Sequence, residues 1–321
     1  VRRAFLSVSG IGLEAAVSHG TSIVSRGDGE ITEIDVERAQ EAARGALPQA
    51  TIINRKVLHA IPLSYKIDGK DLLGPSPEGF KGLKLDVKML FVTCLEQHLQ
   101  DLMAAVEEAG VETIDAMASP LAGSLVTVTK QQKMAGCVLA NIGAETVSVV
   151  VFENGLPVSL EVFPIGGTDI THDIALGLRV SLEEAENIKL GAITRTSYSK
   201  KELEKIVEAR LSDIFDLIEA HLKKIGRNGL LPAGIILTGG GSGINTIEEL
   251  ARAALRLPSR IGLLPLSEGG KPVKDASWAV AYGLTIWGFT GDGRGGHGND
   301  LGLIAKRIWR ALRNLVRPLL P

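Results

Sequence analysis

The sequence predicts an α/β fold, and two glycine-containing turns carry that prediction. An apolar, β-branched run at residues 138–151 is interrupted at Gly143 and Ala144, which predicts two strands joined by a tight hairpin turn. A second apolar strand runs into residues 239–241, which are all glycine, and a helical pattern follows. Turns of this kind direct backbone amides at whatever lies above them, which is how glycine-containing loops hold phosphate.

Each turn by itself also has an ordinary structural explanation. A hairpin turn commonly does no more than reverse the chain, and a glycine turn commonly links a strand to a helix. In the second turn we expect the helix to open near Ile244, with Ser242 or Asn245 as its cap. The two turns lie about a hundred residues apart, and their combination is what favours a nucleotide site.

The pair of turns resembles the actin-like ATPase superfamily and, within it, the bacterial cell-division protein family FtsA. Residues 163–175 and 185–191 are similar to the connecting segment of that family, and residues 57–68 are similar to its inserted domain. The resemblance covers nearly the whole chain. It implies a two-lobed, ribonuclease H-like ATPase fold with a small inserted α+β domain and a C-terminal amphipathic helix.

Composition excludes several other classes of protein. The chain has 321 residues, 45% hydrophobic and 22% charged, with a net charge of −2, so it is globular and gives no indication of nucleic-acid binding. Cys94 and Cys137 form neither a disulfide framework nor a metal-binding spacing, which fits a reducing cytoplasm. No secretory signal opens the chain, and no apolar run reaches the roughly 18 residues that span a bilayer.

Patterning along the chain predicts its organisation. From residue 10 to about 115 the order is strand, helix, strand, strand, helix, strand. Together with the resemblance, this order implies the following parts: a remnant of the first actin-like subdomain (1–9), an inserted interaction domain (10–115), the core with the hairpin (116–180), a helical nucleotide and partner subdomain (181–230), the core with the adenosine motif (231–288), a flexible linker (289–300) and an amphipathic membrane-targeting helix (301–321).

The terminal segment plots as an amphipathic helix at 100° per residue. Its polar face has five cations and no acid, and a glycine-rich stretch separates it from the core. Docking on the globular body is the ordinary explanation, but these features favour a membrane surface. The predicted membrane residues are Ile304, Lys306, Arg307, Ile308, Trp309, Arg310, Leu312, Arg313, Leu315 and Arg317.

The free energies of placing its cations favour a terminal helix that lies on the bilayer over one that crosses it. One Arg at the bilayer centre costs about 2.5 to 3.5 kcal/mol, whereas each cation near an anionic leaflet contributes about 1 kcal/mol. Single copies would therefore bind reversibly, and several copies side by side, as in a filament, would attach firmly.

The resemblance also implies a set of nucleotide-binding residues and ATP with Mg²⁺ as the ligand. The second phosphate loop would contain Asn141, Gly143, Ala144 and Thr146, and the connecting segment Gly166, Gly167 and Thr168. The adenosine motif would contain Gly239, Gly240, Gly241 and Ser242, and the adenine pocket Glu186, Lys189, Glu208 and Arg210. Lys189 could equally pair with Glu186 one helical turn away.

Three departures from the family pattern weaken the enzyme interpretation. Asn141 stands where the family has an acid that holds Mg²⁺-bound water, and Glu145 would repel phosphates. The first phosphate loop, of the type DIGT, does not occur before Ser9, so we expect half of the phosphate clamp to be absent or the chain to be a fragment. ATPase activity is expected to be weak or absent, with no catalytic residue assigned.

By resemblance, the chain is expected to tether the FtsZ ring to the cytoplasmic face of the cell membrane at the division site. Expected partners are the FtsZ carboxyl-terminal tail, anionic lipids, further copies of the chain in a filament and other division proteins through the inserted domain. A basic cluster at Lys200, Lys201 and Lys205 is the predicted tail contact, although such clusters are commonly solvated faces. A pilus-assembly protein of the PilM type and an active ATPase are the alternatives.

Overall fold

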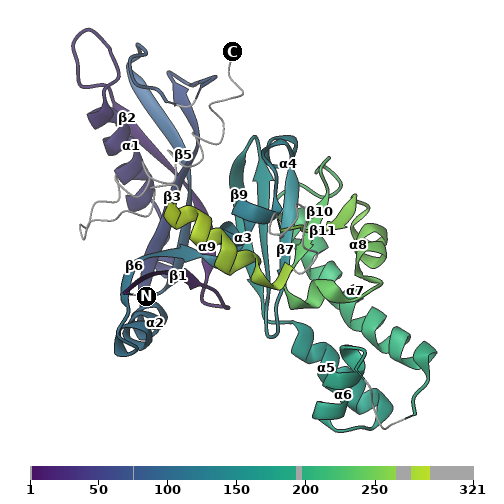
Figure 1. Cartoon of the computed structure of the whole chain (residues 1–321). Helices are drawn as coiled ribbons and strands as arrows, with labels where there is room; N and C mark the ends of the chain where they lie inside the picture. The colour runs from purple at the N-terminus through teal and green to yellow at the C-terminus, as the bar shows by residue number, and fades with distance from the viewer. Residues whose placement is uncertain (1, 75, 193–196, 265–275, 290–321) are drawn as a thin grey trace. The chain divides into compact units, whose positions relative to one another are not determined.

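The computed structural model describes residues 2–74, 76–192, 197–264 and 276–289. Their contacts divide the chain into two compact units (Figure 1). The second unit consists of Pro120–Gly155 and Leu160–Gly283, and the first holds the described residues before Pro120 with Leu156–Ser159 and residues 284–289. Both units combine helices with strands, which agrees with the predicted α/β class.

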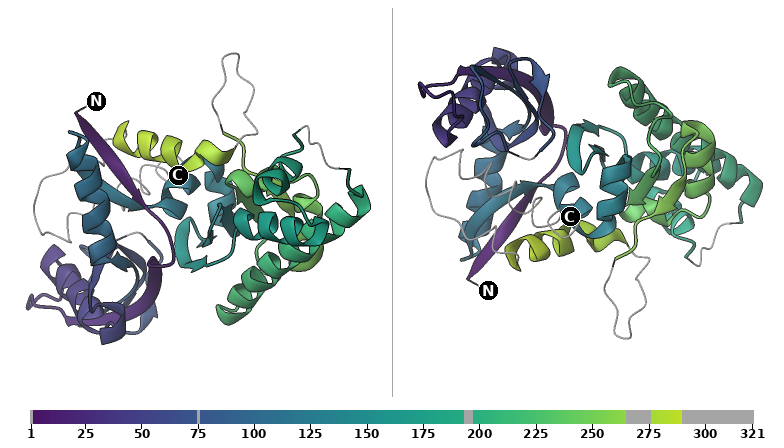
Figure 2. Two further views of the ribbon diagram at one scale, coloured as in Figure 1. Left: turned by 90° about the horizontal axis from the view of Figure 1, so that it is seen from below. Right: turned by 90° about the horizontal axis from the view of Figure 1, so that it is seen from above.

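The first unit contains a four-stranded antiparallel sheet in the order β2 (Glu14–Ile23), β5 (Lys84–Leu95), β3 (Arg55–Ile67), β4 (Lys70–Asp71). Helix α1 (Glu33–Gly45) packs on this sheet (Figures 1 and 2). The helix approaches so closely that a Cβ on Gly20 would lie 2.0 Å from the carbonyl oxygen of Ala39. Only glycine fits there, because the backbones of helix and strand are in direct contact.

The first turn of α1 contains a buried carboxylate, that of Asp35. Asp35 accepts hydrogen bonds from the backbone amide and the hydroxyl of Thr32 at 2.9 and 2.7 Å, and from the amide and hydroxyl of Ser25 at 3.0 and 2.8 Å. Desolvation would raise the pKa of Asp35, but these hydrogen bonds lower it to about 2. Thr32 and Asp35 thus form a capping box at the start of α1.

Arg55 connects the start of β2 with the end of β5, which are the first and last strands of this sheet along the chain. Its guanidinium donates to the Gly12 carbonyl oxygen at 2.7 Å and to Thr93 Oγ1 at 3.0 Å, and it pairs with Glu14 at 3.2 Å. Beyond the sheet follow α2 (Glu96–Glu108) and β6 (Glu112–Ala118), which pairs in parallel with β1 (Arg3–Val8). The predicted element order is confirmed, with β4 and a short 3₁₀ helix (Gln49–Thr51) in addition.

A five-stranded sheet has the order β11 (Ser259–Ile261), β10 (Ile235–Thr238), β7 (Cys137–Ile142), β8 (Val147–Glu153), β9 (Leu156–Phe163), and its first four strands belong to the second unit. Strand β10 is parallel to both β7 and β11, and β7 is antiparallel to β8. Residues 137–140, 147 and 149–152 are buried. Continuous apolar runs of this kind form strands covered on both faces, so the predicted hairpin is confirmed as the centre of this core.

Helices after residue 119 are α3 (Ser119–Thr127), α4 (Lys130–Ala135), α5 (Gly167–Leu178), α6 (Leu182–Lys189), α7 (Lys200–Lys224), α8 (Ile247–Leu255) and α9 (Ala279–Phe289). Helix α5 packs against both α6 and α7 (Figure 1). The buried stripe of α7 contains Leu211, Ile214, Phe215, Ile218 and Leu222. No described helix is long and apolar enough to cross a membrane.

Replacing Gly20 tests the contact between α1 and β2. We expect Gly20→Ala to lower the free energy of unfolding by about 1 to 3 kcal/mol, because the new methyl group overlaps the Ala39 carbonyl oxygen. Gly27→Ala is the control, since a Cβ there meets nothing within 4 Å. Urea unfolding followed by circular dichroism measures both variants, and equal stabilities would contradict the close approach.

His59 predicts a pH dependence of stability. Its buried ring accepts a hydrogen bond at Nε2 from the Ala118 amide at 3.0 Å, and burial lowers its pKa from 6.5 to about 4. Between pH 6.5 and 4 the unfolded chain therefore binds a proton that the folded chain does not, so stability decreases as pH falls through this range. The expected loss is up to about 3 kcal/mol at 1.36 kcal/mol per pKa unit.

The measurement compares unfolding free energies at pH 7 and pH 4.5. His59→Gln should flatten the pH dependence relative to the unsubstituted chain, while His19→Gln, at an exposed position, should leave it unchanged. Parallel curves for the chain and for His59→Gln would refute a neutral, buried imidazole.

Candidate functional site

Two parallel strands of the second unit end side by side. Asn141 near the end of β7 lies opposite Thr238 at the end of β10. The hairpin turn after β7 and the glycine turn after β10 therefore meet at one edge of the sheet, as expected for the carboxyl ends of parallel strands. The two motifs, far apart in the sequence, are brought together as predicted.

The hairpin turn spans four residues between β7 and β8. The Gly143 amide donates to the Thr146 carbonyl oxygen at 2.9 Å and closes the turn. Ala144 and Glu145 at its tip are exposed, and their backbone amides donate to no acceptor in the described residues. Two free amides at the tip of a turn make a local group of donors for an anion.

Helix α5 begins on the carbonyl oxygens of this turn. The amides of Gly167 and Thr168 donate to the carbonyl oxygens of Gly143 and Ala144, both at 2.9 Å. A Cβ on Gly166 would lie 2.2 Å from the Ala144 carbonyl oxygen, so glycine is required at that position. These two amides therefore have protein acceptors and fix the start of α5 at the turn, and nucleotide binding by Gly166, Gly167 and Thr168 stays a prediction.

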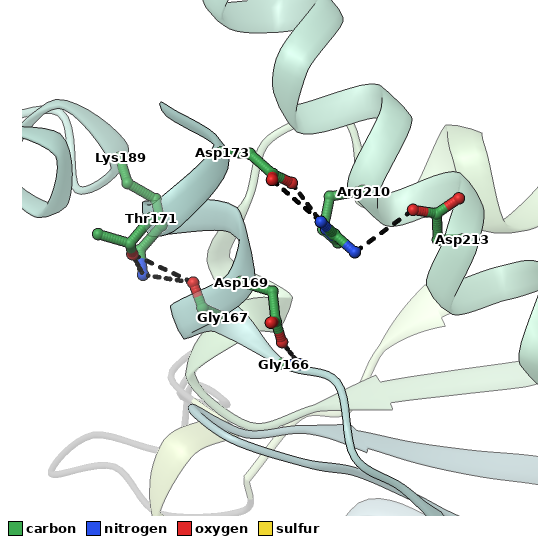
Figure 3. A network of polar contacts seen from close by, with 8 residues as sticks. All are labelled: Gly166, Gly167, Asp169, Thr171, Asp173, Lys189, Arg210 and Asp213. Atoms are coloured by element: carbon green, nitrogen blue, oxygen red, sulfur yellow. Dashed lines mark hydrogen bonds and ion pairs between the residues drawn. The ribbon is translucent and has the colours of Figure 1, made fainter. Parts of the chain in front are cut away.

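Lys189 connects α6 to the first turn of α5 by hydrogen bonds (Figure 3). Its Nζ donates to the Gly167 carbonyl oxygen at 3.0 Å and to Thr171 Oγ1 at 2.7 Å, and it forms an ion pair with Glu186 at 2.7 Å. Thr171 also donates to the same Glu186 carboxylate. Desolvation would raise the pKa of Glu186, but the hydrogen bonds from Lys189 and Thr171 lower it. The pairing of Lys189 with Glu186 considered from the sequence is confirmed.

Arg210 makes a second connection to α5, from α7 (Figure 3). It holds the Asp173 carboxylate through two nitrogens, at 2.7 and 3.0 Å, and it pairs with Asp213 at 3.5 Å. Hydrogen bonding to Asp173 raises the pKa of Arg210. Glu208, predicted beside it, is exposed and has no ion-pair partner in the described residues.

The glycine turn approaches the backbone of β7. A Cβ on Gly239, where φ is +84°, would lie 2.3 Å from Asn141 Oδ1, and one on Gly241 would lie 2.4 Å from a methyl group of Ile142. By contrast, a Cβ on Gly240 meets nothing within 4 Å. Gly239 and Gly241 are thus needed for packing, whereas Gly240 leaves space for a ligand to approach the backbone.

The helix after this turn starts later than predicted. Residues Gly240–Gly243 form a 3₁₀ helix, and α8 begins at Ile247 with Thr246 as its N-cap, not near Ile244 with Ser242 or Asn245. Ser242 is buried, and its hydroxyl donates to the Gly239 carbonyl oxygen at 2.7 Å. The run of glycines delays the helix because each glycine disfavours helical structure.

Some predicted residues lie elsewhere. Lys200, Lys201 and Lys205 are exposed at the start of α7. The linker and the membrane segment, with Ile304, Lys306, Arg307, Ile308, Trp309, Arg310, Leu312, Arg313, Leu315 and Arg317, lie outside the described residues.

Thr171 and Asp173 were missed by sequence reasoning. The one available signal for Thr171 was its position four residues after Gly167, on the same helix face. Asp173 meets Arg210 only through helix packing, which leaves no local signal.

Comparison with known proteins decides the family. The family model described as cell division protein FtsA matches residues 138–283, and that of the SHS2 domain inserted in FtsA matches residues 12–93. Cell division protein FtsA of Pseudomonas aeruginosa is 30% identical over 311 residues, covering 90% of this chain and 73% of the relative. The chain belongs to the FtsA family. The FtsA of Bacillus subtilis is also 30% identical, covering 88% of this chain and 67% of its own length.

One solved structure shares the fold of this chain. The PilM–PilN type IV pilus biogenesis complex superposes with a TM-score of 0.63 at 18% identity, covering 92% of this chain and 81% of that chain. Identity this low shows the fold alone. The actin-like fold class with a small inserted domain is thus confirmed for this FtsA-family chain.

Substitutions in the glycine turn should separate packing from ligand access. Gly239→Ala is expected to lower the unfolding free energy by more than about 1 kcal/mol, because of its positive φ and the contact with Asn141. Gly240→Ala is the matched control and should change stability by less than about 0.5 kcal/mol. Thermal unfolding of both variants tests this, and a destabilised Gly240→Ala would mean that Gly240 is needed for packing too.

Proposed function

We propose that this FtsA-family protein is a peripheral scaffold that tethers the FtsZ ring to the cytoplasmic face of the cell membrane and helps to recruit the division machinery. Family membership, shown by 30% identity over 90% of the chain, is the observation that carries the proposal. The basic, acid-free amphipathic pattern of residues 301–317 supplies the membrane attachment.

Nucleotide binding is proposed as regulatory, with ATP and Mg²⁺ as the ligand. The described residues fit such a ligand at the edge of the sheet, where the amides of Ala144 and Glu145 are free and the Gly240 backbone is open on one side. Asn141 and the glycine turn would lie along the nucleotide, and the turn amides would bind its phosphates. Bound Mg²⁺ would neutralise phosphate charge.

Partner binding is proposed for two surfaces. The exposed Lys200, Lys201 and Lys205 would steer the FtsZ carboxyl-terminal tail to the start of α7, if that tail carries acidic residues. The inserted domain, which extends to about residue 115 in our proposed division of the chain, would contact other division proteins. Self-association into a filament would place many membrane segments side by side.

The two alternatives differ from this proposal in measurable ways. A pilus-assembly function of the PilM type shares the fold but would not require the basic amphipathic segment. An active ATPase would require hydrolysis, which the uncharged Asn141 side chain disfavours because phosphoryl transfer relies on charge placed around metal and water.

Membrane binding should depend on Trp309. Trp309→Glu puts a charge in the apolar face, so we expect this variant to stay in the supernatant when the chain is pelleted with anionic liposomes. Trp278→Glu, at an exposed tryptophan outside the segment, is the matched control and should pellet like the unsubstituted chain. High salt should weaken the binding. If Trp309→Glu pellets as much as the control, the membrane proposal is wrong.

Nucleotide binding should depend on Gly240 and should occur with little hydrolysis. Gly240→Asp puts a carboxylate into the open space of the glycine turn, so ATP affinity measured by calorimetry should fall by at least about tenfold. Gly27→Asp, also at an unobstructed glycine, should have no effect. Phosphate release from the chain should be near zero. Brisk release would move the protein into the enzyme class, and unchanged affinity in Gly240→Asp would exclude ATP from this turn.

A further inference from the structure

Glu145 is held in place at the tip of the hairpin turn. Its Oε1 accepts a hydrogen bond from Thr168 Oγ1 at 2.7 Å, on the first turn of α5. The backbones of the same two segments are already joined by the hydrogen bond from the Thr168 amide to the Ala144 carbonyl oxygen. The carboxylate is therefore fixed beside the free amides of Ala144 and of Glu145 itself.

The surrounding charges leave this carboxylate unneutralised. Glu145 forms no ion pair in the described residues. The carboxylate of Asp169, which accepts the Gly166 amide at 2.7 Å, interacts with Arg210. Lys189 is the ammonium group at this end of α5, but it is already engaged by the Gly167 carbonyl oxygen and by Glu186 at 2.7 Å. Among the described residues, no cation therefore pairs with the Glu145 carboxylate.

Such an arrangement distinguishes a phosphate group without a metal ion from one that carries a divalent cation. The free amides attract phosphate oxygens, but the Glu145 carboxylate repels bare phosphates across a short distance. A divalent cation reverses that repulsion, because Mg²⁺ is commonly bound by one or two carboxylates together with substrate phosphates.

We propose that Glu145 makes nucleoside triphosphate binding at this turn conditional on a divalent cation. The inference rests on the proposed nucleotide site and adds the form of nucleotide that the site accepts. Thr168 is a positioning residue, since its hydroxyl holds the carboxylate at the turn without touching the ligand.

The test measures ATP affinity by calorimetry with Mg²⁺ and with EDTA. The unsubstituted chain should bind Mg·ATP at least about tenfold more tightly than metal-free ATP. Glu145→Gln keeps an oxygen that can accept from Thr168 and removes the charge. Its affinity for metal-free ATP should rise about fivefold or more, and its preference for the magnesium complex should shrink accordingly. Thr168→Val keeps the charge and releases the carboxylate, so its preference should lie between the two.

Glu204→Gln is the control, because Glu204 is exposed on α7 and the substitution changes the net charge equally. It should keep the preference of the unsubstituted chain. If ATP binds and Glu145→Gln keeps the full preference for Mg·ATP over metal-free ATP, this inference is overturned and the proposed nucleotide site is not. ATP that binds neither the unsubstituted chain nor Glu145→Gln under any condition would overturn the proposed nucleotide site as well.

Discussion

The arrangement of the candidate site depends on two backbone hydrogen bonds. The amides of Gly167 and Thr168 donate to the carbonyl oxygens of Gly143 and Ala144 and dock α5 on the hairpin turn. Because the docking is made by backbone, it leaves no room for a side chain at Gly166. It also uses two of the four donors that a helix N-terminus would otherwise offer to an anion, the amides of Gly167 and Thr168. The amides at the tip of the turn remain available to a ligand.

Helix α5 extends this arrangement to the neighbouring helices. Near its start, the Gly167 carbonyl oxygen accepts from Lys189 on α6, and one turn and a half further on Asp173 holds Arg210 on α7. Both cations are therefore engaged by acceptors of the protein itself. In a member of the FtsA family, the helix that begins at the hairpin turn is thereby tied to α7, whose first residues carry the basic cluster proposed for partner binding.

Several features of the site were predictable from sequence because they depend on local chemistry or periodicity. The hairpin, the glycine turn after β10 and the pairing of Lys189 with Glu186 all have short-range signals. The cap of α8 was misplaced at Ser242 or Asn245, because Gly240–Gly243 form a 3₁₀ segment and Thr246 is the N-cap. The contacts of Thr168 with Glu145 and of Asp173 with Arg210 join residues 23 and 37 positions apart, and no local pattern marks them.

The amino-acid sequence by itself determined the α/β class, the element order and the resemblance to the FtsA family, since these follow from hydrophobic periodicity and from glycines at strand ends. Tertiary structure decided which polar groups remain available to a ligand. The sequence did not show that Gly166 packs against the Ala144 carbonyl oxygen or that the Gly167 amide donates to the turn. Gly240, indistinguishable in sequence from Gly239 and Gly241, is the glycine of the three that faces open space. The physical reason is that backbone donors, acceptors and space are assigned by contacts between distant segments, which local pattern does not encode.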